Sequence, residues 1–250
     1  MNGDACLALR GVTKRFGSLT VLEDVNVEVR AGERCGIIGP NGAGKSTLFN
    51  IVAGELALTR GNVAFLGRDV TRRSAHARAR MGLARTFQTT TLFPKLTVIE
   101  NLILALQAHS GERFQMLAPL TRQRHRYDEA LALLERVGLR SRADENVAAL
   151  GYGEQRQIEI LLAIAQKPKL LLLDEPTAGL APADASLVTE MLKRERAGIT
   201  MVLIEHDMGV VFDVVDRLVV LHHGRVVADG PLDAVRGDAR VQEIYLGGTL

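Results

Sequence analysis

Residues 39–47 read Gly39-Pro40-Asn41-Gly42-Ala43-Gly44-Lys45-Ser46-Thr47. This stretch fills every position of the pattern G-x-x-x-x-G-K-[ST], in which glycines let the backbone curl so that its N–H groups point at phosphate oxygens. Lys45 adds a positive point charge, and the Ser46 hydroxyl is a ligand for Mg²⁺. The apolar residues 35–38 before the stretch indicate a buried strand, and the helical pattern from Lys45 to about Val52 aims its positive dipole end at the same anion. This context predicts a phosphate-binding loop of a nucleoside triphosphatase rather than an ordinary glycine-rich turn.

The charge of the chain is nearly balanced, with a net charge of +2 over 250 residues. A chain of this length forms one large core or a main domain with a small lobe. The charge balance gives no support for a nucleic-acid partner, and none is expected. Arginines nevertheless cluster in two places, where we expect solvated faces or partner contacts: Arg72, Arg73, Arg78, Arg80, and Arg113, Arg122, Arg124, Arg126.

The two cysteines, Cys6 and Cys35, are too few for a disulfide framework, and a reducing cytoplasmic setting is expected. Cys35 is predicted to pack as a small apolar residue beside the phosphate loop. No signal peptide is expected at the N-terminus, and the longest apolar run, residues 170–173, is far below the ~20 residues of a membrane helix.

The pattern along the chain predicts an α/β fold with a mixed sheet, an antiparallel β subdomain and an inserted α-helical subdomain. Alternation of apolar and polar residues over 7–12 and 21–29 indicates half-buried antiparallel strands. A helical pattern from about residue 96 to residue 166 indicates the inserted lobe. We place this lobe at about 89–166 in a single domain of residues 1–250, whose core covers about 1–88 and 167–250. From residue 169 onward strands alternate with helices, which is typical of a parallel sheet, and a hairpin at residues 221–225 precedes a short terminal helix.

A second set of polar residues follows the apolar run 170–173, namely Asp174 and Glu175. A continuous apolar run predicts a buried parallel strand, and α/β sheets place their ligands at the carboxyl end of such strands. Asp174 is then suited to orient Mg²⁺, and Glu175 to polarise the attacking water as a general base. An acidic turn after a strand is the alternative without function.

The segment Leu150-Gly151-Tyr152-Gly153-Glu154-Gln155-Arg156 precedes a helical pattern and offers glycine N–H groups at a helix start. It resembles the signature L-S-G-G-Q of the ATP-binding-cassette (ABC) ATPase family. The resemblance implies that Gly151, Tyr152, Gly153 and Glu154 of one subunit complete the ATP site of a second subunit. Gly151 stands where the family usually has serine, which removes a hydroxyl from this contact. We therefore expect Gly151→Ser to tighten ATP-dependent dimerisation.

The same resemblance implies roles for three further residues. Phe16 matches an aromatic that stacks on adenine, Gln88 a glutamine that senses Mg²⁺ and the γ-phosphate, and His206 a switch histidine that contacts the γ-phosphate. Phe16 as a surface aromatic and His206 as a structural histidine are the alternatives. Residues 178–181 match a subunit-contact loop, although Ala181 stands where that loop often has an acidic residue.

Residues 84–101, 205–208 and 241–247 are similar to one branch of the family, the ATPases of branched-chain amino-acid uptake, with close relatives for amides and urea. This resemblance implies a peripheral subunit on the cytoplasmic face of the inner membrane, bound to two permease subunits and a second, identical or different, ATPase subunit. A periplasmic binding protein would deliver the substrate. Leu92, Phe93 and Pro94 are expected to be exposed and to receive the permease, or else to cap the next helix.

Two other functions remain open at this point. A non-transport ABC ATPase acting on nucleic acid or ribosomes would typically carry a coiled-coil insert or a second cassette, and the chain shows neither. A monomeric P-loop kinase or GTPase fits less well with the signature-like segment and His206, and the guanine-reading pattern N-K-x-D is missing.

Overall fold

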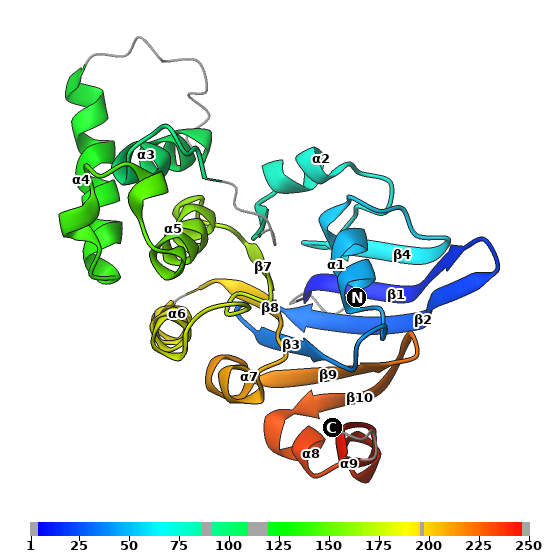
Figure 1. Ribbon diagram of the computed structural model, residues 1–250. Coiled ribbons are helices and arrows are strands. Elements are labelled where there is room, and N and C mark those ends of the chain that lie inside the picture. Colours follow the sequence, from blue (N-terminus) through cyan, green and yellow to red (C-terminus); the bar gives the residue numbers. More distant parts are fainter. Residues whose placement is uncertain (1–4, 87–91, 110–119, 196–197, 247–250) are drawn as a thin grey trace. The chain divides into compact units, whose positions relative to one another are not determined.

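The computed structural model describes residues 5–86, 92–109, 120–195 and 198–246. The chain divides into two compact units (Figure 1). The first, which we call the core unit, comprises Met1–Arg85, Lys169–Glu175 and Arg196–Leu250. The second, which we call the helical unit, comprises Thr86–Pro168 and Pro176–Glu195. The lobe boundaries expected from the sequence, about 89–166, stay a prediction.

The first sheet of the core unit has four strands in the order β2-β1-β4-β5, all antiparallel to their neighbours. The strands are β1 (Ala5–Phe16), β2 (Leu19–Arg30), β4 (Arg60–Phe65) and β5 (Arg68–Asp69). Burial alternates along the second half of β2, where Val25, Val27 and Val29 point inward between exposed polar residues. The structure therefore confirms the antiparallel strands expected from the sequence alternation.

The second sheet has six strands in the order β10-β9-β3-β8-β7-β6. The strands are β3 (Arg34–Ile38), β6 (Leu83–Arg85), β7 (Leu170–Asp174), β8 (Thr200–Ile204), β9 (Arg217–His222) and β10 (Arg225–Pro231). All neighbours are parallel except β9 and β10, which form the expected hairpin. Residues of β3, β7 and β8 are buried throughout, as expected for parallel strands that are covered on both faces.

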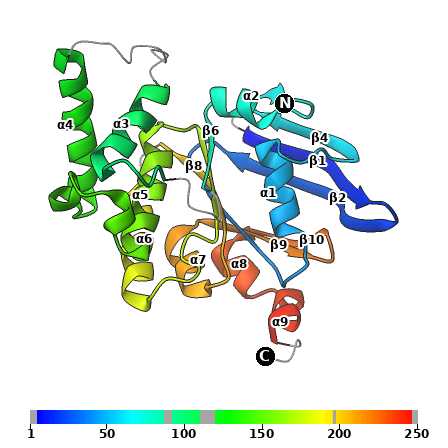
Figure 2. The ribbon, with the colours of Figure 1, turned by 45° about the horizontal axis from the view of Figure 1, so that its top comes forward.

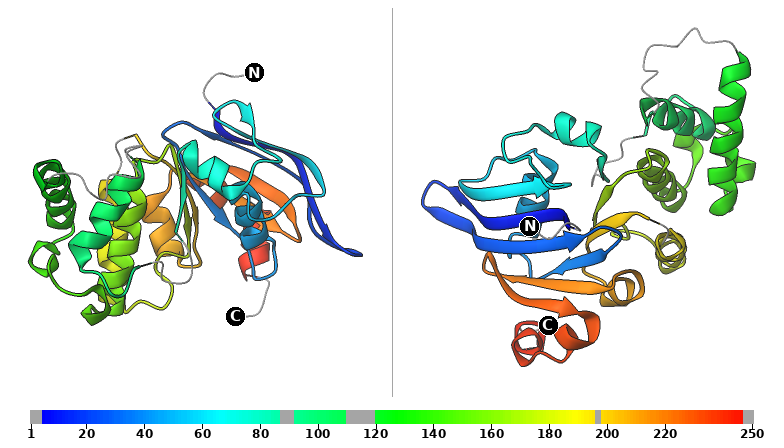
Figure 3. Two further views of the ribbon diagram at one scale, coloured as in Figure 1. Left: turned by 90° about the horizontal axis from the view of Figure 1, so that it is seen from above. Right: turned by 180° about the vertical axis from the view of Figure 1, so that it is seen from behind.

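Helix α1 (Lys45–Ala53) lies between the two sheets and contributes to an apolar cluster of the core unit (Figure 2). Strand β3 alternates between the two faces of its sheet: Cys35 and Ile37 belong to the cluster with α1. Gly36 lies on the other face, where an added Cβ would be 2.7 Å from a methyl of Leu218 and 3.5 Å from Val211 of α7 (Met208–Val214). Helices α1 and α7 thus cover opposite faces of the six-stranded sheet (Figure 3). The remaining helices of this unit are α2 (Ala75–Arg80), α8 (Leu232–Arg236) and α9 (Ala239–Leu246).

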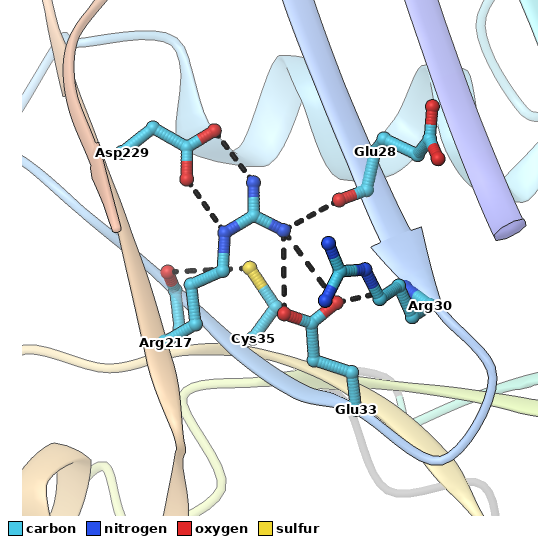
Figure 4. Close-up of polar contacts among 7 residues, drawn as sticks. Glu28, Arg30, Glu33, Cys35, Arg217 and Asp229 are labelled. Atoms are coloured by element: carbon cyan, nitrogen blue, oxygen red, sulfur yellow. Dashed lines mark hydrogen bonds and ion pairs between the residues drawn. The ribbon is translucent and has the colours of Figure 1, made fainter. Parts of the chain in front are cut away.

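A network of polar contacts centred on Arg217, at the start of β9, joins the two sheets (Figure 4). Arg217 makes two parallel bonds of 2.6 Å to the carboxylate of Asp229 and donates to the Glu28 carbonyl at 2.5 Å. Burial alone lowers the pKa of Arg217, but the bonds and charge of Asp229, with Cys35 and Glu33, raise it above its ordinary value. Cys35 is fully buried beside this cluster, and burial raises its pKa to about 12. The thiol is therefore an inert packing group, as expected.

Arg78 is buried, with 2% exposed, whereas its neighbours Arg72, Arg73 and Arg80 are exposed. Its guanidinium donates at 2.7 Å to the carbonyls of Ile51 and Val52 in the last turn of α1, and at 2.7 Å to that of Val70. A cation at the C-terminus of a helix satisfies carbonyls that lack intrahelical partners. The expectation of a solvated or partner-contacting face is thus wrong for Arg78, which fastens α2 to α1.

The helical unit packs α3 against both α4 and α5, and α5 against α6. Its helices are α3 (Val98–His109), α4 (Leu120–Arg136), α5 (Tyr152–Ala165) and α6 (Pro182–Arg194), with 3-10 turns η1 (Arg140–Arg142) and η2 (Val147–Ala149). Arg156 and Glu159 of α5 form a buried ion pair at 2.9 Å. None of the helices in the described part of the chain has both the length and the apolarity that spanning a membrane requires.

The turn before α3 corrects one expectation. Phe93 is exposed, and Asn101 fixes its backbone by accepting from its N–H at 2.8 Å and donating to its carbonyl at 3.2 Å. Leu92, however, is buried, with 8% exposed, because an apolar side chain beside a helix start gains free energy by packing. The exposed apolar group is therefore Phe93, with Pro94 beside it.

Candidate nucleotide-binding site

The phosphate loop connects β3 to α1, and its backbone requires glycine at both ends. Gly39 has φ +155° and Gly44 has φ +102°, where side chains are disfavoured. A Cβ on Gly39 would overlap the carbonyl oxygen of Leu221, and one on Gly44 would lie 2.6 Å from a methyl of Leu22. Neighbouring strands fix the loop from outside, since Gly224 in the β9–β10 turn donates to the Ala43 carbonyl at 3.1 Å. The glycines expected to curl the backbone therefore do so under close packing.

The loop forms one side of a pocket of about 200 Å³. Its lining residues are Val21, Asn41, Gly42, Ala43, Gly44, Lys45, Ser46, Thr47, Glu175 and His206. The first turn of α1 contains no acidic residue, so the positive end of the helix dipole is not neutralised within the helix. This arrangement attracts an anion to the backbone N–H groups.

Lys45 is buried, and its ammonium donates to the carbonyls of Gly39 at 2.6 Å and Pro40 at 3.2 Å. Burial lowers the pKa of Lys45, while the charges of Glu175 and Asp174 oppose this shift. The side chain of Lys45 thus folds back over its own loop. It lines the same pocket as Glu175, which follows β7.

Two adjacent parallel strands bring Glu175 and His206 to the pocket. Asp174 at the end of β7 pairs with Ile204 at the end of β8, and Glu175 N–H donates to the Ile204 carbonyl at 2.9 Å. His206 Nε2 then lies 2.8 Å from Glu175 Oε1. Glu175 has φ +47°, a conformation that is uncommon for a residue with a side chain and that occurs often at functional sites. The histidine and the glutamate expected to act together are therefore in direct contact beside the phosphate loop.

Asp174 is buried, with 1% exposed, and forms an ion pair with Arg85 at 3.0 Å. Arg85 ends β6 and also donates at 2.7 Å to Asn50 of α1 and to Glu55. Arg85 was not among the residues predicted for the site. The available signal was an arginine at the end of a short apolar strand, three residues before Gln88.

Two predicted nucleotide contacts remain predictions. Phe16 lies at the end of β1, 49% exposed, with the Lys14 ammonium 4.6 Å from its ring centre. It is not among the residues that line the pocket. Gln88 lies outside the described residues.

The signature segment lies in the helical unit, at the start of α5. Gly151 precedes the helix, and its N–H donates to the Glu154 carboxylate at 3.0 Å. Tyr152 is exposed, and Gly153 packs so closely that an added Cβ would lie 2.7 Å from Cβ of Asp184 in α6. Arg142 forms an ion pair with Glu154 at 3.3 Å. This segment thus lies at a helix start, but it already includes a negative charge of its own.

A phosphate loop between β3 and α1, with an acidic pair at the end of β7 and a histidine at the end of β8, defines a P-loop ATPase. The chain belongs to the ABC transporter family, whose sequence profile, described as ABC transporter, matches residues 22–178.

Relatives match along nearly the full length of the chain. The high-affinity branched-chain amino acid transport ATP-binding protein LivG of Salmonella typhimurium is 38% identical over 248 residues, covering 96% of this chain and 97% of LivG. The ADP conformation of MJ1267, an ATP-binding cassette of an ABC transporter, is similar with a TM-score of 0.81 and 31% identity over 97% of this chain and 99% of MJ1267. A dimeric post-hydrolysis state of the cassette MJ0796, bound to ADP and Pi, has a TM-score of 0.76 and 27% identity over 90% of this chain and 98% of MJ0796.

Proposed function

We propose that this chain binds and hydrolyses ATP to drive a membrane importer for branched-chain amino acids or for related small polar solutes such as amides or urea. The observation that carries the proposal is the pocket in which the phosphate loop, Glu175 and His206 meet. The substrate class rests on the relative LivG, whose name describes branched-chain amino-acid transport. A non-transport function on nucleic acid or ribosomes gains no support from these relatives.

The phosphates of ATP would occupy the pocket above the first turn of α1. There the loop N–H groups and the helix dipole attract the anion, and Lys45 turns from its own carbonyls to the phosphates. Phe16, exposed at the end of β1, would stack on the adenine. The pocket is lined mainly by the phosphate loop and Phe16 is not among its lining residues, so the adenine would lie outside it.

Ser46 and Asp174 are the residues that would hold Mg²⁺. Both offer the oxygen atoms that Mg²⁺ prefers, and Mg²⁺ in such sites takes one or two protein ligands together with phosphate oxygens and water. Ser46 lines the pocket, and Asp174 ends the strand that positions Glu175, so the donor set fits the ion. When bound, Mg²⁺ neutralises charge on the phosphates during transfer. Gln88 would sense the same ion and the γ-phosphate.

Glu175 would accept the proton of the attacking water. Its backbone is fixed by the bond to Ile204, and its carboxylate is oriented by His206, which would also contact the γ-phosphate. A base whose orientation is set before the substrate arrives loses less entropy in the transition state.

A second ATPase subunit would complete the site. Residues 151–154 of one subunit would contact the ATP held by the phosphate loop of the other, and closure of the pair would move two permease subunits. A dimer with ADP and Pi in MJ0796 supports this assembly. The exposed Phe93 and Pro94 would meet a permease, and the chain would then lie peripherally on the cytoplasmic face of the inner membrane. A periplasmic binding protein would act indirectly through the permease.

The substitution Glu175→Gln tests this proposal. The amide keeps the size of the side chain but accepts no proton, so ATP binding persists while hydrolysis falls by about 10²-fold or more. ATP should then hold the variant in a closed dimer, which gel filtration with ATP and Mg²⁺ detects as a doubled mass.

Glu190→Gln on α6 is the matched control, since it removes an exposed carboxylate outside the site. It should hydrolyse ATP like the unaltered protein. Near-normal turnover by Glu175→Gln would refute the assignment of Glu175, and failure of the unaltered protein to bind ATP would refute the proposed function as a whole.

A further inference from the structure

Arg85 contacts three parts of the core unit, namely the end of β7, helix α1 and the residues that follow α1. Its Nη2 lies 3.0 Å from Asp174 Oδ2, and its Nη1 donates at 2.7 Å to both Asn50 Oδ1 and Glu55 Oε2. Only 10% of its side chain is exposed, against 2% for Asp174 and 35% for Glu55. The contact with Asp174 is therefore the protected part of the network, whereas the contact with Glu55 is partly hydrated and weaker.

The contact with Asn50 links Arg85 to α1, the helix that begins at the phosphate loop. Asn50 and Ser46 both belong to α1 and lie four residues apart, so they occupy the same side of the helix in successive turns. Arg85 thereby joins Asp174 to the side of α1 that carries Ser46. Asp174 and Ser46 are both residues that would hold Mg²⁺, and Arg85 links the elements that carry them.

Arg85 is not among the residues that line the pocket, and its ion pair is with Asp174. A planar guanidinium also contacts several oxygens at fixed angles, which an ammonium does not.

We propose that Arg85 is a positioning residue of the Mg²⁺ site, which holds Asp174 at a fixed distance from the Ser46 side of α1 and so sets the affinity of the site for the metal. The inference rests on the proposed function, because it needs the chain to bind Mg²⁺ with ATP. It predicts that loss of Arg85 affects nucleotide binding only where Mg²⁺ takes part.

The test compares the affinity for a non-hydrolysable ATP analogue in EDTA with that at increasing Mg²⁺. For Arg85→Gln we expect unchanged affinity in EDTA and a loss of about 10- to 100-fold in the apparent affinity for Mg²⁺, the usual effect of removing a residue that orients a metal ligand. Asn50→Ala should share this defect in weaker form, since it leaves the ion pair but removes the link to α1. Glu55→Gln should titrate with Mg²⁺ like the unaltered protein.

Arg85→Lys separates charge from geometry and remains usable if Arg85→Gln does not fold. A lysine keeps a cation beside Asp174 but cannot bridge Asp174 and Asn50 at the same time, so we expect only partial recovery of the Mg²⁺ response. A purely structural role would lower the melting temperature of Arg85→Gln without changing its Mg²⁺ titration, and this result would overturn the inference. So would a normal Mg²⁺ titration of Asn50→Ala. Failure of the unaltered protein to bind the analogue in EDTA and in Mg²⁺ contradicts the proposed function instead.

Discussion

Helices α1 and α5 both begin at glycine-rich segments, one in each unit, and the constraints on their glycines differ. Before α1, Gly44 has φ +102° and no room for a Cβ beside Leu22. Before α5, Gly151 has φ −63° and ψ 157°, which any residue adopts, and the nearest atom to an added Cβ is 3.7 Å away. Gly153, inside α5, lacks room only because α6 packs against it.

The two helix starts also differ in the charge of their first turns. The first turn of α1 has no acidic residue, whereas that of α5 contains Glu154, whose carboxylate accepts from Gly151 N–H. The positive end of α1 is thus left for a ligand, and that of α5 is partly compensated by the protein. The start of α1 is therefore the more favourable of the two for an anion bound within a single subunit.

Gly44→Ala tests the α1 side of this comparison and should have the largest effect. Strain at positive φ costs about 1–3 kcal/mol. Displacement of the loop by Leu22 should lower the rate of ATP hydrolysis by about 10²-fold, since small errors in position are costly for reacting groups. Steady-state ATPase assays and thermal unfolding measure both effects. Gly42→Ala is the control, because Gly42 has φ +80° but open space around it. Equal losses in the two variants would show that crowding by Leu22 is unimportant.

Gly153→Ala tests packing without backbone strain. Alanine favours a helix over glycine by about 1 kcal/mol, so any net destabilisation must come from Asp184. Overpacking costs about 1–3 kcal/mol, and we expect a net loss of about 1 kcal/mol in the free energy of unfolding. Adding Asp184→Ala should recover part of this loss, and a double-mutant cycle measures the coupling. Additive effects of the two substitutions would contradict a direct contact.

Gly151→Ser should have the smallest effect on stability, and its sign should be favourable. Serine fits the space and caps α5, which adds a few tenths of a kcal/mol relative to glycine. The hydroxyl should also tighten ATP-dependent dimerisation, measured by sedimentation in a Glu175→Gln background. Gly151→Ala fills the same space without a hydroxyl and should not tighten the dimer. Equal dimer yields with serine and with glycine at position 151 would contradict the prediction that the hydroxyl tightens the dimer.

Much of the core unit was predictable because its signals are local. The period-two alternation of β2, the continuous apolar run of β7 and the loop motif each follow from a few consecutive residues. The contact between Glu175 and His206 also follows, since residues after adjacent parallel strands lie at one edge of a sheet.

Long-range partners were not predictable from such signals. Arg78 reads as one of several surface arginines, yet it is buried because five backbone carbonyls, including those of Ile51 and Val52, converge on it. Leu92 was expected to be exposed, yet its side chain is buried. Arg85 meets Asp174 across 89 residues of sequence. No local periodicity encodes any of these contacts.

The sequence by itself determined that this protein has a phosphate loop, an acidic pair after a buried strand and membership of a family, because motifs and periodicity are properties of neighbouring residues. Tertiary structure alone decided which glycines are indispensable and which arginines are structural. It also decided that Arg85 joins Asp174 to α1. The physical reason is that steric room, burial and ion pairing depend on atoms that distant segments bring together, and these have no trace in the local pattern.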